Sequence, residues 1–141
     1  MTNKKMIQVT AAIIRKDNRF LCAQRNDSGD QASKWEFPGG KTEIGETPEF
    51  SLERELHEEF NIKASCGDFL CENKHDYGDK IINLKAYFIN YTHGDFQLLV
   101  HKDIKWLTCD TMLQLDWAEA DLPIVHRLIA HCKLENNHQT T

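Results

Sequence analysis

The stretch from Gly39 to Ile62 places the strongest constraint on how this 141-residue chain can fold. It opens with two adjacent glycines and ends in an acid-rich segment that reads Arg-Glu-Leu-His-Glu-Glu over residues 54–59. Glycine lets the backbone approach a ligand closely, and carboxylates are the ligands that hard divalent cations prefer. The stretch therefore predicts a combined metal and phosphate site, which the rest of the chain is expected to support.

A helix is predicted to begin near Thr47 and to end at Asn61. Thr47 is a good N-cap residue, Pro48 suits the first helical position, and Asn61 tolerates the left-handed conformation of a C-cap. Large apolar residues recur every four positions and form one core-facing stripe. The stripe consists of Leu52, Leu56 and Phe60.

Three glutamates of this helix are expected to share one edge. Glu58 lies roughly 60° to one side of Glu55, and Glu59 lies roughly 40° to the other side. Crowded like charges destabilise a helix slightly, and a bound divalent cation would turn that repulsion into ligation. A solvated acidic face is the alternative interpretation. The neighbouring glycines and Lys41, a point charge suited to a phosphate oxygen, favour the metal site.

Composition argues against several other classes of protein. The net charge of −5 gives no general attraction to nucleic acid polymers or membranes. Neither a signal peptide nor a transmembrane span is recognised, so we expect one domain in the cytoplasm. The five cysteines form no Cys-x-x-Cys pair, which argues against a zinc site and a disulfide framework. We interpret them as small buried hydrophobic residues.

The order of the predicted elements indicates an α+β fold with a mixed sheet. The expected strands are 6–14, 20–25, 35–37, 65–75, 80–91 and a last one ending at Leu107. The first two are expected to form a hairpin. The expected helices are 47–61, a short one at 109–114 and a last one from Ala120 or Asp121 to Cys132. Residues 133–141 are expected to be a polar tail.

The central stretch resembles the signature of the Nudix hydrolases, Gly-x5-Glu-x7-Arg-Glu-U-x-Glu-Glu-x-Gly-U, where U is a bulky aliphatic residue. Eight of the nine positions match, and Asn61 stands where the signature has glycine. The matching residues are Gly40, Glu46, Arg54, Glu55, Leu56, Glu58, Glu59 and Ile62. The resemblance implies a Nudix fold over residues 1–132, with a mixed β-sheet sandwiched between helices.

The resemblance also implies hydrolysis of a phosphoanhydride with Mg²⁺ or Mn²⁺. The implied metal ligands are the Gly39 carbonyl, Glu55, Glu58 and Glu59, and the implied residues that orient them are Arg54 and Glu46. In some relatives a loop glutamate before the tryptophan of the last strand serves as a ligand or a general base. That loop has no glutamate here, so His101 and Asp103 are candidates, with Glu58 or Glu59 as the alternative bases.

Beyond the signature, the chain resembles small MutT-like nucleoside triphosphate pyrophosphohydrolases, particularly the bacterial CTP pyrophosphohydrolase type. By this comparison Arg25 and Lys41 contact the phosphates, and Phe37 and a residue of strand 82–88 flank the base. Core packing is the alternative for Phe37. Asp121 is expected to read the base, to cap the last helix, or to do both. Its ionised carboxylate would accept from the amino group of cytosine, and its protonated form would donate to an oxopurine.

The expected activity is hydrolysis of a (d)NTP to a (d)NMP and pyrophosphate. The expected substrates are CTP, dCTP, 5-methyl-dCTP or 8-oxo-dGTP, bound by a monomer or a homodimer. Hydrolysis of dinucleoside polyphosphates or nucleotide sugars is an alternative within the same chemistry. A non-catalytic binding module is an alternative of another class, although such modules typically lose a signature carboxylate and this chain keeps all four.

Overall fold

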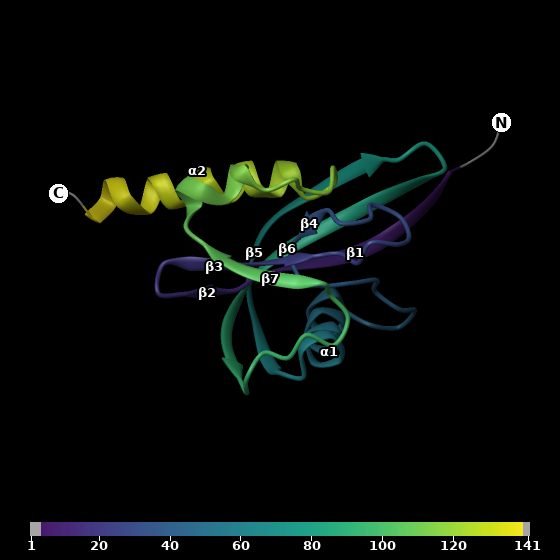
Figure 1. Ribbon diagram of the computed structural model, residues 1–141, viewed down its shortest axis with the longest axis horizontal. Helices are drawn as coiled ribbons and strands as arrows, with labels where there is room; N and C mark the ends of the chain where they lie inside the picture. Colours follow the sequence, from purple (N-terminus) through teal and green to yellow (C-terminus); the bar gives the residue numbers. More distant parts are fainter. Residues whose placement is uncertain (1–3, 140–141) are drawn as a thin grey trace.

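The strands lie between two helices in the computed structural model, which describes residues 4–139. Figure 1 shows α1 on one side of the strands and α2 on the other, so the predicted α/β/α sandwich is confirmed. The elements in order are β1 (Lys5–Ile13), β2 (Arg15–Lys16), β3 (Arg19–Gln24), β4 (Trp35–Glu36), α1 (Pro48–Phe60), β5 (Lys63–Asp76), β6 (Lys80–His93), β7 (Asp103–Leu107), the 3₁₀ helix η1 (Cys109–Gln114) and α2 (Leu122–Gln139).

The strands form two sheets rather than one. In the mixed sheet, β6 is central and pairs with β1 in parallel and with β5 in antiparallel orientation. The second sheet is antiparallel, and its central strand β3 pairs with β2, β4 and β7. The mixed sheet predicted from the sequence is therefore confirmed, together with a second sheet that was not predicted.

The predicted hairpin of strands 6–14 and 20–25 is wrong in its extent. In the part of the chain before β3, only the two residues of β2 form ladder pairs with β3. Strand β1 instead runs parallel to β6 from Lys5 to Ile13. Residues 10–13 of β1 are all buried, as expected for a strand that is covered on both faces. A continuous apolar run does not reveal its partner, because local turn signals report only the nearest pairing.

The free edge of β1 is occupied by the segment 38–42, which contains both glycines. Three backbone hydrogen bonds join the two: Ala12 N to Pro38 O at 2.7 Å, Thr10 N to Gly40 O at 2.9 Å and Thr42 N to Gln8 O at 2.9 Å. The glycine segment is therefore held against the sheet like an additional short strand.

Both glycines lie in close contact with neighbouring groups, and the contact of Gly39 is with backbone. A Cβ atom on Gly39, whose φ is +151°, would collide with the carbonyl oxygen of Thr10. A Cβ atom on Gly40 would collide with the carboxylate of Glu55. A larger residue at position 39 would push the segment away from β1, and one at position 40 would displace the carboxylate of Glu55.

Helix α1 has the ends predicted from the sequence. The hydroxyl of Thr47 accepts from the Phe50 N–H at 3.2 Å, and Asn61 has a left-handed backbone with φ of 55°. The apolar stripe is fully buried against β1, β3 and β5, and its residues are Leu52, Leu56 and Phe60. Burial of each side chain contributes about 1.5–3 kcal/mol, which fixes the acidic edge of the helix relative to the glycine segment.

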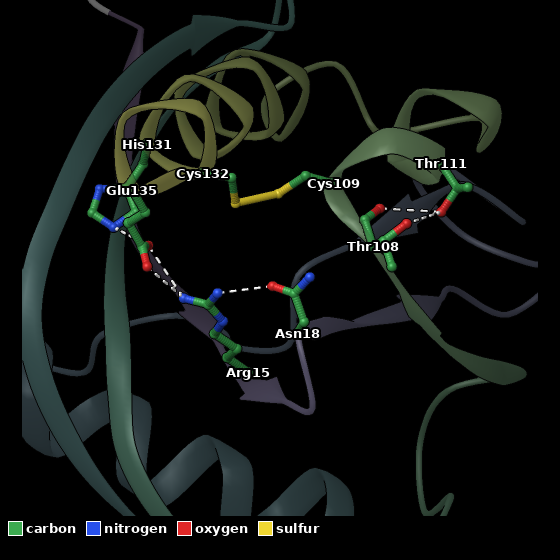
Figure 2. The surroundings of a disulfide bond; sticks show 8 residues. All are labelled: Arg15, Asn18, Thr108, Cys109, Thr111, His131, Cys132 and Glu135. Carbon is green, nitrogen blue, oxygen red and sulfur yellow. Dashed lines mark hydrogen bonds and ion pairs between the residues drawn. A yellow bond between two sulfur atoms is a disulfide. The ribbon is translucent and has the colours of Figure 1, made fainter. Parts of the chain in front are cut away.

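The C-terminal region differs from the prediction in two respects. Helix α2 continues to Gln139, so the predicted end of this helix at Cys132 is wrong; residues 140–141 lie outside the described part. Cys109 and Cys132 form a disulfide between η1 and α2 (Figure 2), although no disulfide was expected. The two cysteines are 23 positions apart in the sequence, and this spacing carries no signal of their proximity in the fold.

Within residues 4–139, no helix is both long and apolar enough to cross a bilayer.

Substitution of Gly39 by alanine is expected to destabilise the protein far more than Gly45→Ala. Gly45 also has a positive φ, of +88°, but a Cβ atom there would have no neighbour within 4 Å, so only the backbone preference is lost, at about 1–2 kcal/mol. Gly39→Ala adds a collision with the backbone of β1, and we expect a total loss of at least ~3 kcal/mol in the free energy of unfolding. Urea denaturation of both variants measures the difference. Equal losses would contradict the close packing of the glycine segment.

Candidate functional site

A cleft of about 770 Å³ brings together most of the residues that the sequence singled out. Its walls come from β1, the glycine segment, α1, β6, the loop before β7 and the residues before α2. The predicted site residues that line it are Arg25, Phe37, Gly39, Gly40, Lys41, Arg54, Glu55, Glu58, Glu59, His101 and Asp121. Ile82 and Leu84, from the strand expected to flank the base, also line it. Glu46 and Asp103 do not.

Arg54 organises the acidic edge of α1. Its guanidinium donates to Glu46 at 2.6 and 2.9 Å, to Glu55 at 3.1 Å and to Glu58 at 3.2 Å. It also donates to the Lys41 carbonyl at 3.1 Å. The hydrogen bond from Arg54 lowers the pKa of Glu46, and the same bond raises the pKa of Arg54. Arg54 and Glu46 thus lie where residues that orient metal ligands are expected, with Glu46 behind the wall of the cleft.

Glu59 is the most buried of the signature carboxylates. Its Oε1 accepts from the Gly39 N–H at 3.2 Å, and burial raises its pKa to about 9, with further contributions from the charges of Glu36 and Glu55. Burial also raises the pKa of Glu55. Buried carboxylates resist ionisation when no cation is near. A cation bound at this end of the cleft would stabilise the ionised forms of Glu55 and Glu59.

The donors at this end suit a hard divalent cation. They are the Gly39 carbonyl and the carboxylates of Glu55, Glu58 and Glu59, and all supply oxygen atoms. Among residues 4–139, however, no three acidic, histidine or cysteine side chains already converge on one point. Glu55 and Glu58 point to Arg54, and Glu59 points to the Gly39 N–H, so rotation of these side chains would be needed for joint ligation.

His101 lies inside the cleft, beside the carboxylates. Its Nε2 is 2.8 Å from Glu36 Oε2 and 3.9 Å from Glu59 Oε2, and its ring stacks on Phe60 at 5.3 Å between centroids. The side chain is almost completely buried, and its Nδ1 has no hydrogen-bond partner among the described residues. This position is compatible with a role in proton transfer or in holding Glu59.

Asp103 lies elsewhere. It is exposed at the start of β7, and its Oδ1 accepts from the Ile104 N–H at 2.8 Å. It lies outside the cleft wall, so its position does not favour it as the general base. The sequence placed both candidates on one loop, and the beginning of β7 separates them.

Glu36 is a cleft residue that the sequence analysis missed. Its carboxylate accepts from Arg25 Nη1 at 3.0 Å and bonds His101 through its other oxygen, so it links the predicted phosphate-binding arginine to the imidazole. A charged residue between the buried aromatics Trp35 and Phe37 was an available signal, because the middle residue of a strand faces away from its neighbours. Lys41 is exposed where it lines the cleft, and its position is compatible with a phosphate contact.

The other end of the cleft, called the apolar end here for its lining by Phe37, Ile82, Leu84, Ala118 and Ala120, also contains Asp121. Its Oδ2 accepts from the N–H of Phe37, the residue that follows β4, at 3.0 Å. The carboxylate therefore bonds the chain after β4 rather than capping α2. Burial raises the pKa of Asp121 well above its usual value, and the charge of Glu36 adds to this effect. The ring of Phe37 packs on Trp117 at 4.9 Å, so Phe37 both belongs to the core and lines the cleft. Tyr77, also not predicted, accepts from the Ala120 N–H at 2.9 Å.

Comparisons with known proteins agree with this arrangement. The family model described as NUDIX domain matches residues 9–127. The CTP pyrophosphohydrolase of Escherichia coli (strain K12) is 39% identical over 126 residues, which cover 89% of this chain and 93% of the relative. The 8-oxo-dGTP diphosphatase of Haemophilus influenzae is 34% identical over 128 residues, which cover 90% and 94%.

A solved structure shows the same fold. The solution structure of the E. coli ORF135 protein is similar with a TM-score of 0.82 and 38% sequence identity, over 90% of this chain and 91% of the other. Sequence similarity and the fold thus extend along most of the length of these relatives. The chain belongs to the Nudix family and is a Nudix hydrolase.

Proposed function

We propose that this Nudix hydrolase is a Mg²⁺-dependent nucleoside triphosphate pyrophosphohydrolase that converts a (d)NTP and water into a (d)NMP and pyrophosphate. The observation that carries the proposal is the continuity of the cleft, which joins the signature carboxylates to the apolar end at Phe37 and Asp121. Its volume of about 770 Å³ is within the usual range for small-molecule sites. The names of the relatives support nucleotide substrates.

The residues of the acidic end would hold the metal and position the phosphates. Nudix hydrolases generally use divalent metals; a bound Mg²⁺ or Mn²⁺, held by Glu55, Glu58, Glu59 and the Gly39 carbonyl, would neutralise phosphate charge and lower the pKa of the attacking water. Arg54 keeps Glu55 and Glu58 on one edge through its hydrogen bonds.

Two positively charged side chains and a general base complete the proposed mechanism. Arg25 and Lys41 line the cleft and would bind phosphate oxygens. A signature glutamate, Glu58 or Glu59, accepts the proton of the attacking water. His101 is the other candidate base, because its Nε2 lies 3.9 Å from Glu59 and therefore close to the reacting atoms.

Asp121 is the proposed base-reading residue. Because Oδ2 accepts from the Phe37 N–H, the other carboxyl oxygen is left to meet the nucleobase. In its ionised form it would accept from the amino group of cytosine, which suits CTP, dCTP or 5-methyl-dCTP. The raised pKa favours the protonated form, which donates, and this favours 8-oxo-dGTP as a second candidate substrate.

We propose that the protein acts in the cytoplasm, as a monomer or homodimer, on small nucleotides rather than on nucleic acid polymers. Dinucleoside polyphosphate or nucleotide-sugar hydrolysis would use the same acidic end. A non-catalytic binding module is disfavoured, because all four signature carboxylates are present and three of them, Glu46, Glu55 and Glu58, are bonded by Arg54.

Substrate choice can be tested by measuring pyrophosphate release with Mg²⁺. The panel is CTP, dCTP, 5-methyl-dCTP, 8-oxo-dGTP, diadenosine polyphosphates and ADP-ribose. We expect release from at least one of the four triphosphates, and no release after chelation of the metal. Release from none of the panel would favour the binding module.

Glu58→Gln is expected to lower kcat by about 10³-fold or more, since it removes a charged ligand while the exposed position leaves the core intact. Asp103→Asn is the matched control, because it also neutralises an exposed carboxylate but lies outside the cleft. Thermal unfolding should show both variants folded. Retention of Mg²⁺-dependent turnover by Glu58→Gln would remove the proposed metal site.

Asp121→Asn is expected to change the ratio of kcat/KM between cytosine and oxopurine triphosphates by about tenfold, because an amide always presents both a donor and an acceptor. The amide oxygen can still accept from Phe37 N–H, so the fold should be retained. The kcat/KM values of wild type and variant on CTP and 8-oxo-dGTP measure the effect. An unchanged ratio would assign Asp121 a purely structural role.

A further inference from the structure

Figure 2 shows the disulfide between Cys109 and Cys132. The chain between these two cysteines includes the segment that forms one wall of the cleft near Phe37. Cys109 is the first residue of η1, and Cys132 lies in the second half of α2. Between these two elements runs the segment 115–121, which supplies Ala118, Ala120 and Asp121 to the cleft. The covalent bond therefore joins the two elements that flank the base-binding segment.

The segment is anchored to β4 by its backbone. Trp35 N donates to Asp116 O at 2.9 Å, and Ala118 N donates to Trp35 O at 2.8 Å. These bonds hold the segment beside Phe37, whose own N–H is bound by Asp121 at 3.0 Å. A shift of the segment therefore moves both the apolar wall and the polar group that meet the base.

The segment is also tied directly to η1 and α2. The indole N–H of Trp117 donates to the Met112 carbonyl of η1 at 2.7 Å, and Asp121 immediately precedes α2. Any change in the distance between η1 and α2 is thus transmitted to Trp117 and Asp121 from opposite sides. The disulfide limits that distance.

An ion pair also connects the C-terminal half of α2 to the rest of the protein, but it is weaker than the disulfide. Arg15 on β2 contacts Glu135 at 3.0 and 3.2 Å, and both side chains are at least one third exposed (Figure 2). Such exposed ion pairs contribute up to about 1 kcal/mol. Apolar packing of Ile129 and Cys132 on the core adds to it, and the disulfide is the covalent restraint.

We propose that the Cys109–Cys132 disulfide is a positioning element for the base-binding end of the cleft, and that its reduction weakens nucleotide binding while leaving the hydrolytic step unchanged. The inference rests on the proposed function for the identity of the ligand. Neither cysteine lines the cleft, so the pair acts through the segment 115–121 and not by contact with the nucleotide.

The redox step is an ordinary thiol–disulfide exchange with a dithiol. A thiolate of the dithiol attacks one sulfur, the bond between Cys109 and Cys132 breaks, and a mixed disulfide forms. The second thiolate of the dithiol then displaces the protein sulfur. The dithiol ends as a disulfide, and Cys109 and Cys132 each end as a protonated thiol.

Kinetics of the oxidised and the dithiothreitol-treated protein test the proposal. With the best triphosphate of the substrate panel, reduction is expected to raise KM about fivefold and to leave kcat within about twofold. The Cys109→Ser/Cys132→Ser double variant should show the raised KM with or without the dithiol. Cys71→Ser, which changes a free half-buried cysteine, should keep the redox response of the wild type.

Two further measurements separate this proposal from the proposed function. Thiol titration of the unfolded, unreduced protein should find three free cysteines, and five after reduction. Hydrogen exchange of the backbone amides of 115–121 should accelerate on reduction. If no nucleotide is hydrolysed but exchange accelerates, the proposed function fails and the positioning role stands. Five thiols before reduction, or equal KM and equal exchange in both states, would overturn the inference.

Discussion

The contact of Gly39 with the backbone of β1 sets the position of the active end of this molecule. One edge of β1 pairs with β6, and the other edge bonds the segment 38–42. A side chain on Gly39 would separate that segment from the Thr10 carbonyl. Because residues 10–13 of β1 are buried and the strand is bonded on both edges, the glycine segment has a firm base from which its carbonyl and N–H groups are presented to the cleft.

Helix α1 lies against the opposite side of the glycine segment. Charged hydrogen bonds of Arg54 connect the helix to the loop that contains the segment. Arg54 bonds Glu46, Glu55, Glu58 and the Lys41 carbonyl, so one guanidinium connects the loop to the helix. Those bonds leave Glu59 without a cation of its own, and burial raises its pKa to about 9. The arrangement is therefore stable around Arg54 and electrostatically incomplete at Glu59, which is the condition expected of a site that takes up a cation.

The parts of the fold that were predicted correctly depend on short-range signals. Thr47, Pro48 and Asn61 define the ends of α1 within one turn each. The spacing of its apolar residues, one every four positions, identifies its buried face. The parts predicted wrongly depend on distant partners. The pairing of β1 with β6 and the disulfide both involve residues far apart in the sequence.

The same division applies to the site. Its acidic end comes from one continuous stretch, so the spacing of Gly40, Glu46 and the helix carboxylates could be read directly from the sequence. Glu36 and Tyr77 were missed because their partners, His101 and Ala120, lie 65 and 43 positions away along the chain. Asp103 was included because the boundary between a loop and a strand is not visible in a single sequence.

The two ends of the cleft therefore respond differently to change. The acidic end is determined by local sequence and by contacts of Arg54 and Gly39, so most substitutions there remove the chemistry altogether. The apolar end is assembled from β4, the turn at Tyr77, β6 and the segment before α2, none of which carries a metal ligand. Under the proposed function, substitutions or restraints in these elements would alter which base is held while the hydrolytic residues stay in place. A shared fold and signature therefore specify the reaction of such a protein more closely than they specify its substrate. Under the proposed function, the position of the segment 115–121 relative to Phe37 is the structural variable on which the choice of substrate depends.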